Sequence, residues 1–179
     1  TLGFPAGTTY SPLKRQTWVG IGAADFLVTG AGSTAAIEFN TAGEFARISN
    51  IGFRASTLFT GSAFKFNASL NCELELPLVR NVLNGVALEF SGGAFYNRVK
   101  NFKVTSAGTA LKITGTSPNC PNNNTIDGID IYGAVGTGLF CDSNCSMFQL
   151  NGYIDEAATT VCKLQVTAAA GLTFNGPRW

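Results

Sequence analysis

Histidine is absent from the 179 residues of this chain, which removes the commonest general base and the commonest side-chain metal ligand of proteins. This absence excludes histidine-dependent catalytic triads and most zinc sites, and we expect no metal ion and no cofactor. Charged residues are also scarce, at 13% of the chain, and the formal net charge is +1. Because nucleic acids and anionic membranes are bound through clustered lysine and arginine, this composition argues against both as partners.

Long apolar runs are missing too, since none approaches the roughly 18 to 20 residues of a membrane span, and we expect no membrane insertion. The cysteines are few, odd in number and spread along the chain, which disfavours a disulfide scaffold. They are Cys72, Cys120, Cys141, Cys145 and Cys162. We expect buried free thiols, because cysteine usually behaves as a small apolar residue, with a bridge that involves Cys120 or Cys145 as the alternative.

A short alternating motif is present instead, and it recurs at nearly regular intervals. Its clearest copy is Ala-Leu-Glu-Phe at residues 87–90, within the stretch 85–104. Equivalent motifs begin at Ala36, Ala63, Ala110, Gly138 and Val161, so the steps between copies are 23 to 28 residues. A repeat of this length built from period-2 strands predicts a solenoid of stacked β-coils.

The aligned copies form columns in which every second residue is apolar and the residues between them alternate in charge. In stacked parallel coils, equivalent residues lie about 4.8 Å apart, so neighbours in a column must be chemically compatible. The outward column of the first strand reads Glu38, Lys65, Glu89, Lys112, Phe140 and Lys163. The outward columns of a second strand read Arg47, Glu73, Arg98 and Ser49, Glu75, Lys100, Asp127, Asn151. The alternation predicts that each run pairs with its equivalents in other coils rather than with its neighbour in a hairpin.

A sharp corner is predicted after the second strand, at Asn50, Leu76, Asn101, Gly128 and Gly152. Asparagine and glycine tolerate the left-handed backbone conformation that a tight bend needs. Leu76, followed by Pro77, breaks this pattern and predicts a bulge. A third strand follows, with apolar residues at Ile51, Pro77, Phe102, Ile129, Tyr153 and then at Phe53, Val79, Val104, Ile131.

These features predict an all-β fold, a single-stranded parallel β-helix of about six coils. The chain is long enough for one domain, residues 1–179, with an opening coil at 1–31 and regular coils at 32–176. Residues 117–124 form an inserted loop.

The chain also resembles a known group of proteins. The similarity lies in residues 4–10 (Phe-Pro-Ala-Gly-Thr-Thr-Tyr), 11–13 (Ser-Pro-Leu), 19–22 (Val-Gly-Ile-Gly), 48–53 (Ile-Ser-Asn-Ile-Gly-Phe) and 122–128 (Asn-Asn-Asn-Thr-Ile-Asp-Gly). It resembles the right-handed parallel β-helices of the pectate-lyase superfamily, as in bacteriophage tailspike and receptor-binding proteins, over about residues 2–157.

This resemblance implies a viral receptor-binding or structural domain that recognises host cell-surface polysaccharide as a homotrimer within a virion. The chain is similar to a shortened member or an excised piece. The alternative implied by the same resemblance is a secreted, extracellular enzyme that acts on envelope or extracellular polysaccharide.

Catalysis, if present, would require a pair of carboxylates several ångströms apart, as in glycoside hydrolases. The ladders already account structurally for Glu38, Glu73, Glu75, Glu89 and Asp127. Among the remaining acids, the candidates are Asp142 with Asp155 or Glu156; simple solvation at the end of the stack is the competing interpretation. A calcium-assisted lyase needs acids that converge on one ion, and the alternating ladders favour a hydrolase over it.

Sugar binding needs exposed aromatic rings that stack on pyranose faces, beside polar side chains that form hydrogen bonds. The candidates are Trp18, Phe95, Tyr96, Tyr132 and Phe140. Phe140 is notable because it stands in an outward column that otherwise holds charges. The competing interpretation is a contact with a loop or a neighbouring chain.

Overall fold

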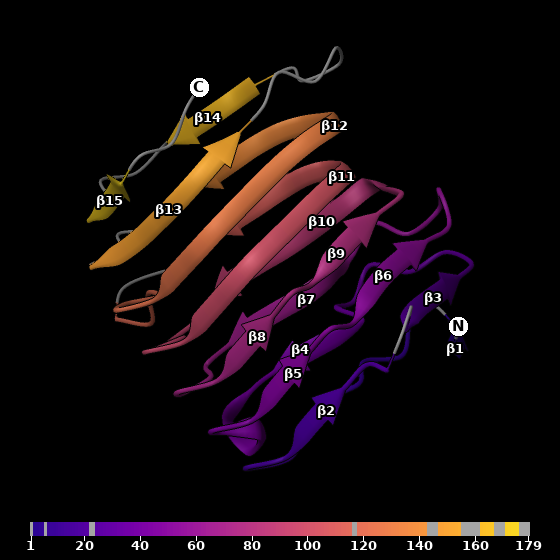
Figure 1. The fold of residues 1–179 in the computed structure, drawn as a ribbon, viewed down its shortest axis with the longest axis horizontal. Helices are drawn as coiled ribbons and strands as arrows, with labels where there is room; N and C mark the ends of the chain where they lie inside the picture. The colour runs from indigo at the N-terminus through magenta and orange to yellow at the C-terminus, as the bar shows by residue number, and fades with distance from the viewer. Residues whose placement is uncertain are drawn as a thin grey trace.

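The computed structural model describes residues 2–5, 7–21, 24–115, 118–142, 147–154, 162–166 and 171–175. The chain is all-β and forms a parallel β-solenoid of about 5 turns, which confirms the predicted fold class. Figure 1 shows equivalent strands stacked from the indigo N-terminal coil to the yellow C-terminal end. The described residues include no helix long and apolar enough to cross a membrane.

Each coil contributes strands to three faces. The first face contains β4 (Ile37–Phe39), β7 (Ser62–Asn67), the end of β10 (Val82–Ser91) and β14 (Cys162–Val166). The second contains β2 (Thr17–Val19), β5 (Arg47–Ser49), β8 (Glu73–Glu75), the start of β13 (Phe148–Ile154) and β15 (Leu172–Asn175). The third contains β1 (Leu2–Pro5), β3 (Asp25–Thr29), β6 (Gly52–Ala55), β9 (Leu78–Arg80) and the end of β13.

Two long strands run through all three faces, as the curved ribbons in Figure 1 show. They are β11 (Arg98–Ile113) and β12 (Thr125–Cys141), which pair in parallel from Arg98 and Thr125 to Ile113 and Cys141. A short 3-10 turn, η1 (Thr41–Gly43), follows β4.

The first-face register agrees with the predicted columns over five coils and differs at the last one. Glu38, Lys65, Glu89, Lys112 and Phe140 are successive Cα partners. The next partner of Phe140 is Gln165, and not Lys163 as the sequence suggested. A shift of two residues leaves the inward and outward alternation unchanged, so the period-2 pattern could not distinguish the two registers.

The residue at the predicted corner has a positive φ at all five predicted positions. The φ angles are 54° at Asn50 and at Leu76, 52° at Asn101, 81° at Gly128 and 140° at Gly152. The prediction of a bulge at Leu76 was wrong. The N–H of Leu76 donates to the Lys100 carbonyl at 2.9 Å, and the strand keeps its regular register. Leucine therefore occupies a conformation that costs most L-residues roughly 1 to 2 kcal/mol.

The register slips by one residue at the last corner. Asn151 is the partner of Asp127, but Gly152 then lies opposite Ile129. Tyr153 consequently pairs with Asp130, whereas the sequence had predicted that it would lie in the column of Ile129. The corner of β13 is one residue shorter, since no residue there corresponds to Gly128.

The core is a stack of inward side chains, among which phenylalanines are continuous on the first face. The rings of Phe39 and Phe66 stack with centroids 4.5 Å apart and planes within 2°, and Phe66 and Phe90 stack at 4.7 Å and 7°. All three are fully buried. In-register coils bring identical residues into ring-on-ring contact, so the repeat in the sequence becomes a continuous packed column.

Buried amides close the turn between the first and second faces, a feature that the sequence columns did not predict. Asn97 and Asn124 are almost completely buried in neighbouring coils. The Asn97 side-chain amide and backbone N–H both donate to Oδ1 of Asn124 at 3.0 Å. Oδ1 of Asn97 accepts from the Cys72 N–H at 2.9 Å, and Nδ2 of Asn124 donates to the Ala94 carbonyl at 2.8 Å. These bonds satisfy buried polar groups that would otherwise destabilise the turn.

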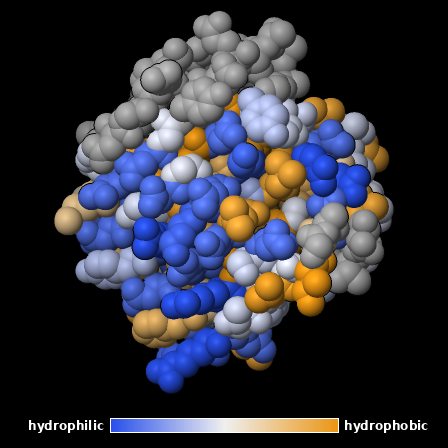
Figure 2. Space-filling view, viewed as in Figure 1, coloured by the Kyte–Doolittle hydropathy of each residue, from blue (hydrophilic) through white to orange (hydrophobic). Residues whose placement is uncertain are grey.

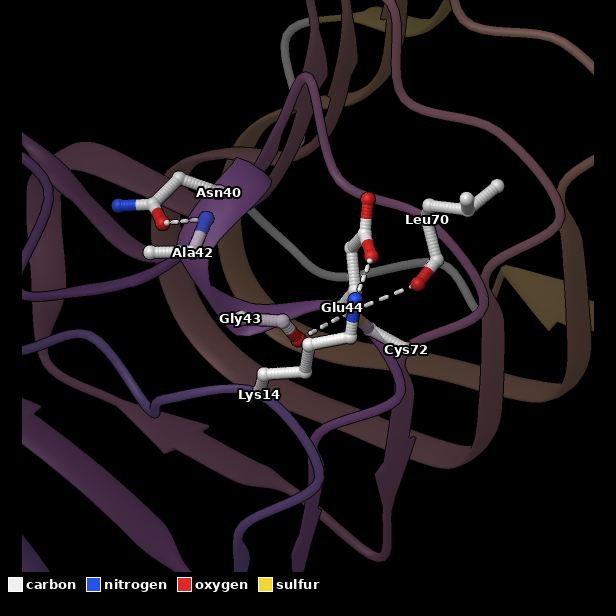
Figure 3. A network of polar contacts seen from close by, with 7 residues as sticks. All are labelled: Lys14, Asn40, Ala42, Gly43, Glu44, Leu70 and Cys72. Atoms are coloured by element: carbon white, nitrogen blue, oxygen red, sulfur yellow. Dashed lines mark hydrogen bonds and ion pairs between the residues drawn. The ribbon is translucent and has the colours of Figure 1, made fainter.

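Cys72 and Cys120 are buried free thiols, as predicted, and Cys141 is buried as well. The thiol of Cys72 donates to the carbonyl of Gly43 at 3.0 Å, and burial raises the pKa of this thiol. Beside it, Nζ of Lys14 lies 2.7 Å from Oε2 of Glu44 (Figure 3). Both contacts attach the end of η1 and the residue after it to neighbouring coils. Cys145 lies outside the described residues.

The charge ladders of the second face are present, but their ion pairs cross between columns. Arg47 lies 3.8 Å from Glu73, as the column predicts. Lys100, however, also pairs with Glu73, and Arg98 pairs with Asp127 at 3.2 Å. The Cα partners are those predicted, while the long side chains reach diagonally to the next column.

Candidate functional site

The predicted catalytic acids can be placed only in part. Asp142 is exposed directly after β12, and its N–H donates to the Ile113 carbonyl at 3.1 Å. It lines a polar hollow of about 450 Å³ together with Gly92, Thr114, Gly115 and Asn119. Asp155 and Glu156 lie outside the described residues, so their pairing with Asp142 stays a prediction.

In the described part of the chain, no three acids or cysteines converge in a way that could hold a metal ion. The described residues therefore give no specific support to a calcium-assisted lyase.

Trp18 points inward and packs against the hydrophobic core of the solenoid. It is the Cα partner of the inward residue Ile48 and is partly buried. With Phe26 and Ile51 it lines an apolar hollow of about 400 Å³. Its indole N–H donates to Oε1 of Gln16 at 3.4 Å. The ring thus covers the N-terminal end of the core as well as facing this hollow.

The other aromatic candidates lie on different parts of the coil and do not form one cluster. Phe95 and Tyr96 occupy the turn between the first and second faces, where Phe95 bridges Leu70 and Asn122 and Tyr96 is 58% exposed. Phe140 is partly buried on the outside of the first face. Tyr132 lies on the third face and is 40% exposed.

Tyr132 stands in an outward row of the third face. Val79, Val104 and Ile131 are successive inward partners, so the residues that follow each of them point outward. These are Arg80, Thr105 and Tyr132, and Arg54 is the partner of Arg80 in the preceding coil.

Tyr132 belongs to a β-bulge, because it and the next residue both lie opposite Thr105. Ile131 is the partner of Val104, but Ala134 is the partner of Ser106, so β12 has one extra residue at this point. Bulges of this kind bend a strand and redirect its side chains, often beside functional sites. The bulge marks the end of the third face at which the tyrosine ring is exposed.

A second outward row runs beside the first and contains Asp25, Gly52, Leu78, Lys103 and Asp130. Nζ of Lys103 lies 3.6 Å from Oδ2 of Asp130, which pairs these two charges. The absence of a side chain at Gly52 admits the Asp25 carboxylate, because a Cβ there would lie 1.9 Å from its Oδ1. Asp25 therefore leans over Gly52 toward the neighbouring coils.

The Asp25 carboxylate joins two arginines. Its Oδ2 lies 2.7 Å from Nη2 of Arg54 and 2.8 Å from Nη2 of Arg80, and the Asp25 side chain is only 7% exposed. A hollow of about 260 Å³, which we call the Arg80 hollow, adjoins the cluster. It is lined by Ala24, Asp25, Asn50, Gly52, Leu76, Leu78 and Arg80.

We refer to the two outward rows, with the Arg80 hollow, as the third-face site. It combines an exposed aromatic ring, hydroxyl and guanidinium donors, and carboxylate acceptors along one side of the solenoid. The second face, which is turned toward the viewer in Figure 2, is mostly hydrophilic, with smaller hydrophobic patches toward the right. The groups of the third-face site suit an extended, oxygen-rich ligand that crosses several coils.

Of this site, the sequence predicted only Tyr132. Arg54 and Arg80 each lie four residues after the corner residues Asn50 and Leu76, so one more aligned column would have found them. Asp25 belongs to the coil whose motif matched the repeat most weakly. Comparison with known protein families, with curated proteins and with solved structures found no significant match for this chain.

Proposed function

We propose that this chain is a receptor-binding domain of a tailspike-like viral protein, which recognises host cell-surface polysaccharide through its third face. The observation that carries this proposal is the exposed ring of Tyr132, which follows Ile131 as Arg80 and Thr105 follow its successive inward partners Val79 and Val104. Assembly as a homotrimer and location in a virion are parts of the same proposal. The parallel β-solenoid is compatible with them.

The geometry supports binding of a polymer rather than of a compact ligand. Successive residues of the row are separated by one coil, about 4.8 Å, so three coils offer three contacts in line. This spacing is comparable with the length of a sugar ring. A pyranose face can stack on Tyr132 while hydroxyl groups of neighbouring sugars meet Thr105 and Arg80.

The described carboxylates of this face are engaged in ion pairs. Asp25 contacts two arginines and Asp130 contacts Lys103. Such acids serve to position cationic donors, which favours recognition of the polysaccharide over its cleavage at this face.

A glycan-array screen of the chain followed by titration of the best ligand tests the proposal. Tyr132→Ala should weaken binding by up to about tenfold, since an aromatic contact contributes roughly 0.5 to 1.5 kcal/mol. Tyr96→Ala is the matched control, because Tyr96 is also exposed but lies in a different turn. No glycan binding, or an equal effect of the two substitutions, would contradict the proposal. Light scattering checks the trimer.

A glycoside hydrolase is the second candidate function, favoured by the polar hollow in which Asp142 lies beside Thr114 and Asn119. Release of reducing ends from an envelope polysaccharide, and its loss in Asp142→Ala, would support hydrolysis. Unsaturated products that absorb in the ultraviolet and depend on calcium would instead indicate a lyase. Intact polymer after prolonged incubation would exclude both for the substrates used.

A further inference from the structure

The charges of the third face depart from the rule that holds on the other faces. On the first face, Glu38, Lys65, Glu89 and Lys112 alternate in sign from coil to coil. On the third face, Arg54 and Arg80 are direct Cα partners in neighbouring coils. Like charges in this position repel each other, and a local departure from a general pattern often marks a functional site.

One carboxylate serves both arginines, so the cluster keeps a net positive charge. Oδ2 of Asp25 accepts a hydrogen bond from Nη2 of Arg80 and forms an ion pair with Nη2 of Arg54. Lys103 and Asp130, the other charges in the row of Asp25, pair with each other. The cluster therefore carries one uncompensated positive charge.

The pairing with Asp25 leaves part of the hydrogen-bonding capacity of the two guanidinium groups unused. Each guanidinium has five N–H donors in a planar fork, and Asp25 engages one nitrogen of each. The two Nε atoms are buried and have no hydrogen-bond partner. The side chains of Arg54 and Arg80 are nevertheless 40% and 38% exposed, so a ligand can reach them from solvent.

The Arg80 hollow supplies the space for a ligand group beside these donors. Leu76 and Leu78 form apolar parts of its wall, and Asn50, Arg80 and the ion-paired Asp25 contribute polar ones. An apolar wall reduces the local screening by water, which strengthens a charge-assisted hydrogen bond. Asp25 holds both arginines in place, so the site is preorganised before any ligand binds.

We propose that Arg54 and Arg80 bind an anionic oxygen group, a carboxylate, sulfate or phosphate substituent of the ligand, at the Arg80 hollow. This inference rests on the proposed function and refines it, because the recognised polysaccharide is then an acidic one. Asp25 is a positioning residue that orients the two guanidinium groups. Tyr132 contacts a neighbouring sugar two coils away, and the charged substituent fixes where along the polymer the chain binds.

The test is calorimetric titration of the whole chain with four probes. These are a uronic-acid oligosaccharide, the same oligosaccharide after reduction of its carboxyl groups, a sulfated oligosaccharide of matched length, and inorganic phosphate. We expect at least one acidic oligosaccharide to bind about tenfold more tightly than the neutral one. The uronic and sulfated probes distinguish the two kinds of substituent, and inorganic phosphate reports binding of a free anion.

Arg80→Gln should abolish this preference for charge, while Arg54 still pairs with Asp25 and keeps the fold. Arg47→Gln is the matched control, because Arg47 is an exposed arginine in an ion pair on the second face. Arg80→Lys keeps the charge but loses the planar fork, and should retain only part of the preference. Thermal unfolding of each variant verifies that the fold is intact.

The outcomes separate this inference from the proposed function. Tyr132-dependent binding with no preference for acidic probes, or equal losses in Arg80→Gln and Arg47→Gln, would overturn the anion site and leave polysaccharide recognition standing. Arg80-dependent binding of inorganic phosphate without binding of any oligosaccharide would support the anion site and overturn the proposed function. Absence of binding by every probe would overturn both.

Discussion

Nζ of Lys65 lies 3.3 Å from Oε1 of Glu89, its Cα partner in the next coil. Both side chains are largely buried, at 25% and 12% exposure, and Oε2 of Glu89 also accepts a hydrogen bond from Ser62. This pair therefore tests the register of the solenoid better than a fully exposed pair would.

Lys65→Glu should lower the free energy of unfolding by about 1 kcal/mol, because it places three acids in one column with Glu38 and Glu89. Lys65→Gln, which removes the charge without adding repulsion, should lower it less. Adding both Glu38→Lys and Glu89→Lys to Lys65→Glu should recover part of the loss, because both Cα partners of position 65 are then basic, although Ser62 loses its acceptor. Denaturant unfolding measures all three, and equal stability of the Glu and Gln variants would contradict the register.

Leu76→Asn should stabilise the chain by about 0.5 to 1 kcal/mol, because asparagine tolerates the φ of 54° that leucine adopts there at a cost. Leu76 is 48% exposed, so little apolar burial is lost. Leu78→Asn, in the regular strand β9, is the control and should destabilise. An unchanged or lower melting temperature for Leu76→Asn would show that the corner is not strained.

Asn124→Ala should destabilise by roughly 2 to 3 kcal/mol, because it leaves the buried amide and N–H of Asn97 without their acceptor. Asn119→Ala, at an exposed position, should change stability by less than about 0.5 kcal/mol. Chemical unfolding of both variants makes the comparison. Similar losses would mean that the buried amides contribute nothing specific.

The raised pKa of Cys72 predicts a loss of stability at alkaline pH. Burial disfavours the thiolate in the folded state, so the folded protein holds its proton to higher pH than the unfolded chain does. This contribution is fully present below 9.0, the ordinary thiol pKa, and is lost as pH rises through the higher pKa of the folded state.

Unfolding experiments between neutral and alkaline pH should therefore show a shallower decline for Cys72→Ala than for the wild type. The substitution itself lowers stability at neutral pH, because it removes a buried side chain. The comparison therefore concerns the pH slope alone. Parallel curves for the two proteins would contradict this prediction.

The sequence predicted the columns well because several copies of the same motif support each column. Each of Glu38, Lys65 and Glu89 sits in a similar motif, and the alternation of charge provides a second criterion that is independent of hydrophobicity. The corner was predictable for the same reason, since asparagine and glycine recur where the backbone must turn. Even Leu76, which looked like an exception, follows the backbone of its neighbours because stacking on both sides imposes it.

The remainder could not be obtained from pattern alone. The pairing of Phe140 with Gln165 differs from the predicted one by two residues, which alternation cannot detect. The contact of Asp25 with Arg80 spans 55 positions and two coil boundaries, and depends on the missing side chain of Gly52. Separation of the aromatic candidates on different faces likewise follows from the three-dimensional path of each coil.

The uninterrupted course of β11 and β12 around all three faces has a consequence for the order of folding. In a solenoid each coil is stabilised mainly by its neighbours, so structure can start at one place and spread along the axis. These two strands form the longest parallel pairing of the described chain, and each continues through its corners as one strand, with a single bulge after Val104. We expect them to act as the folding nucleus, with backbone amides that exchange with solvent last, and the outer coils to assemble on them in both directions.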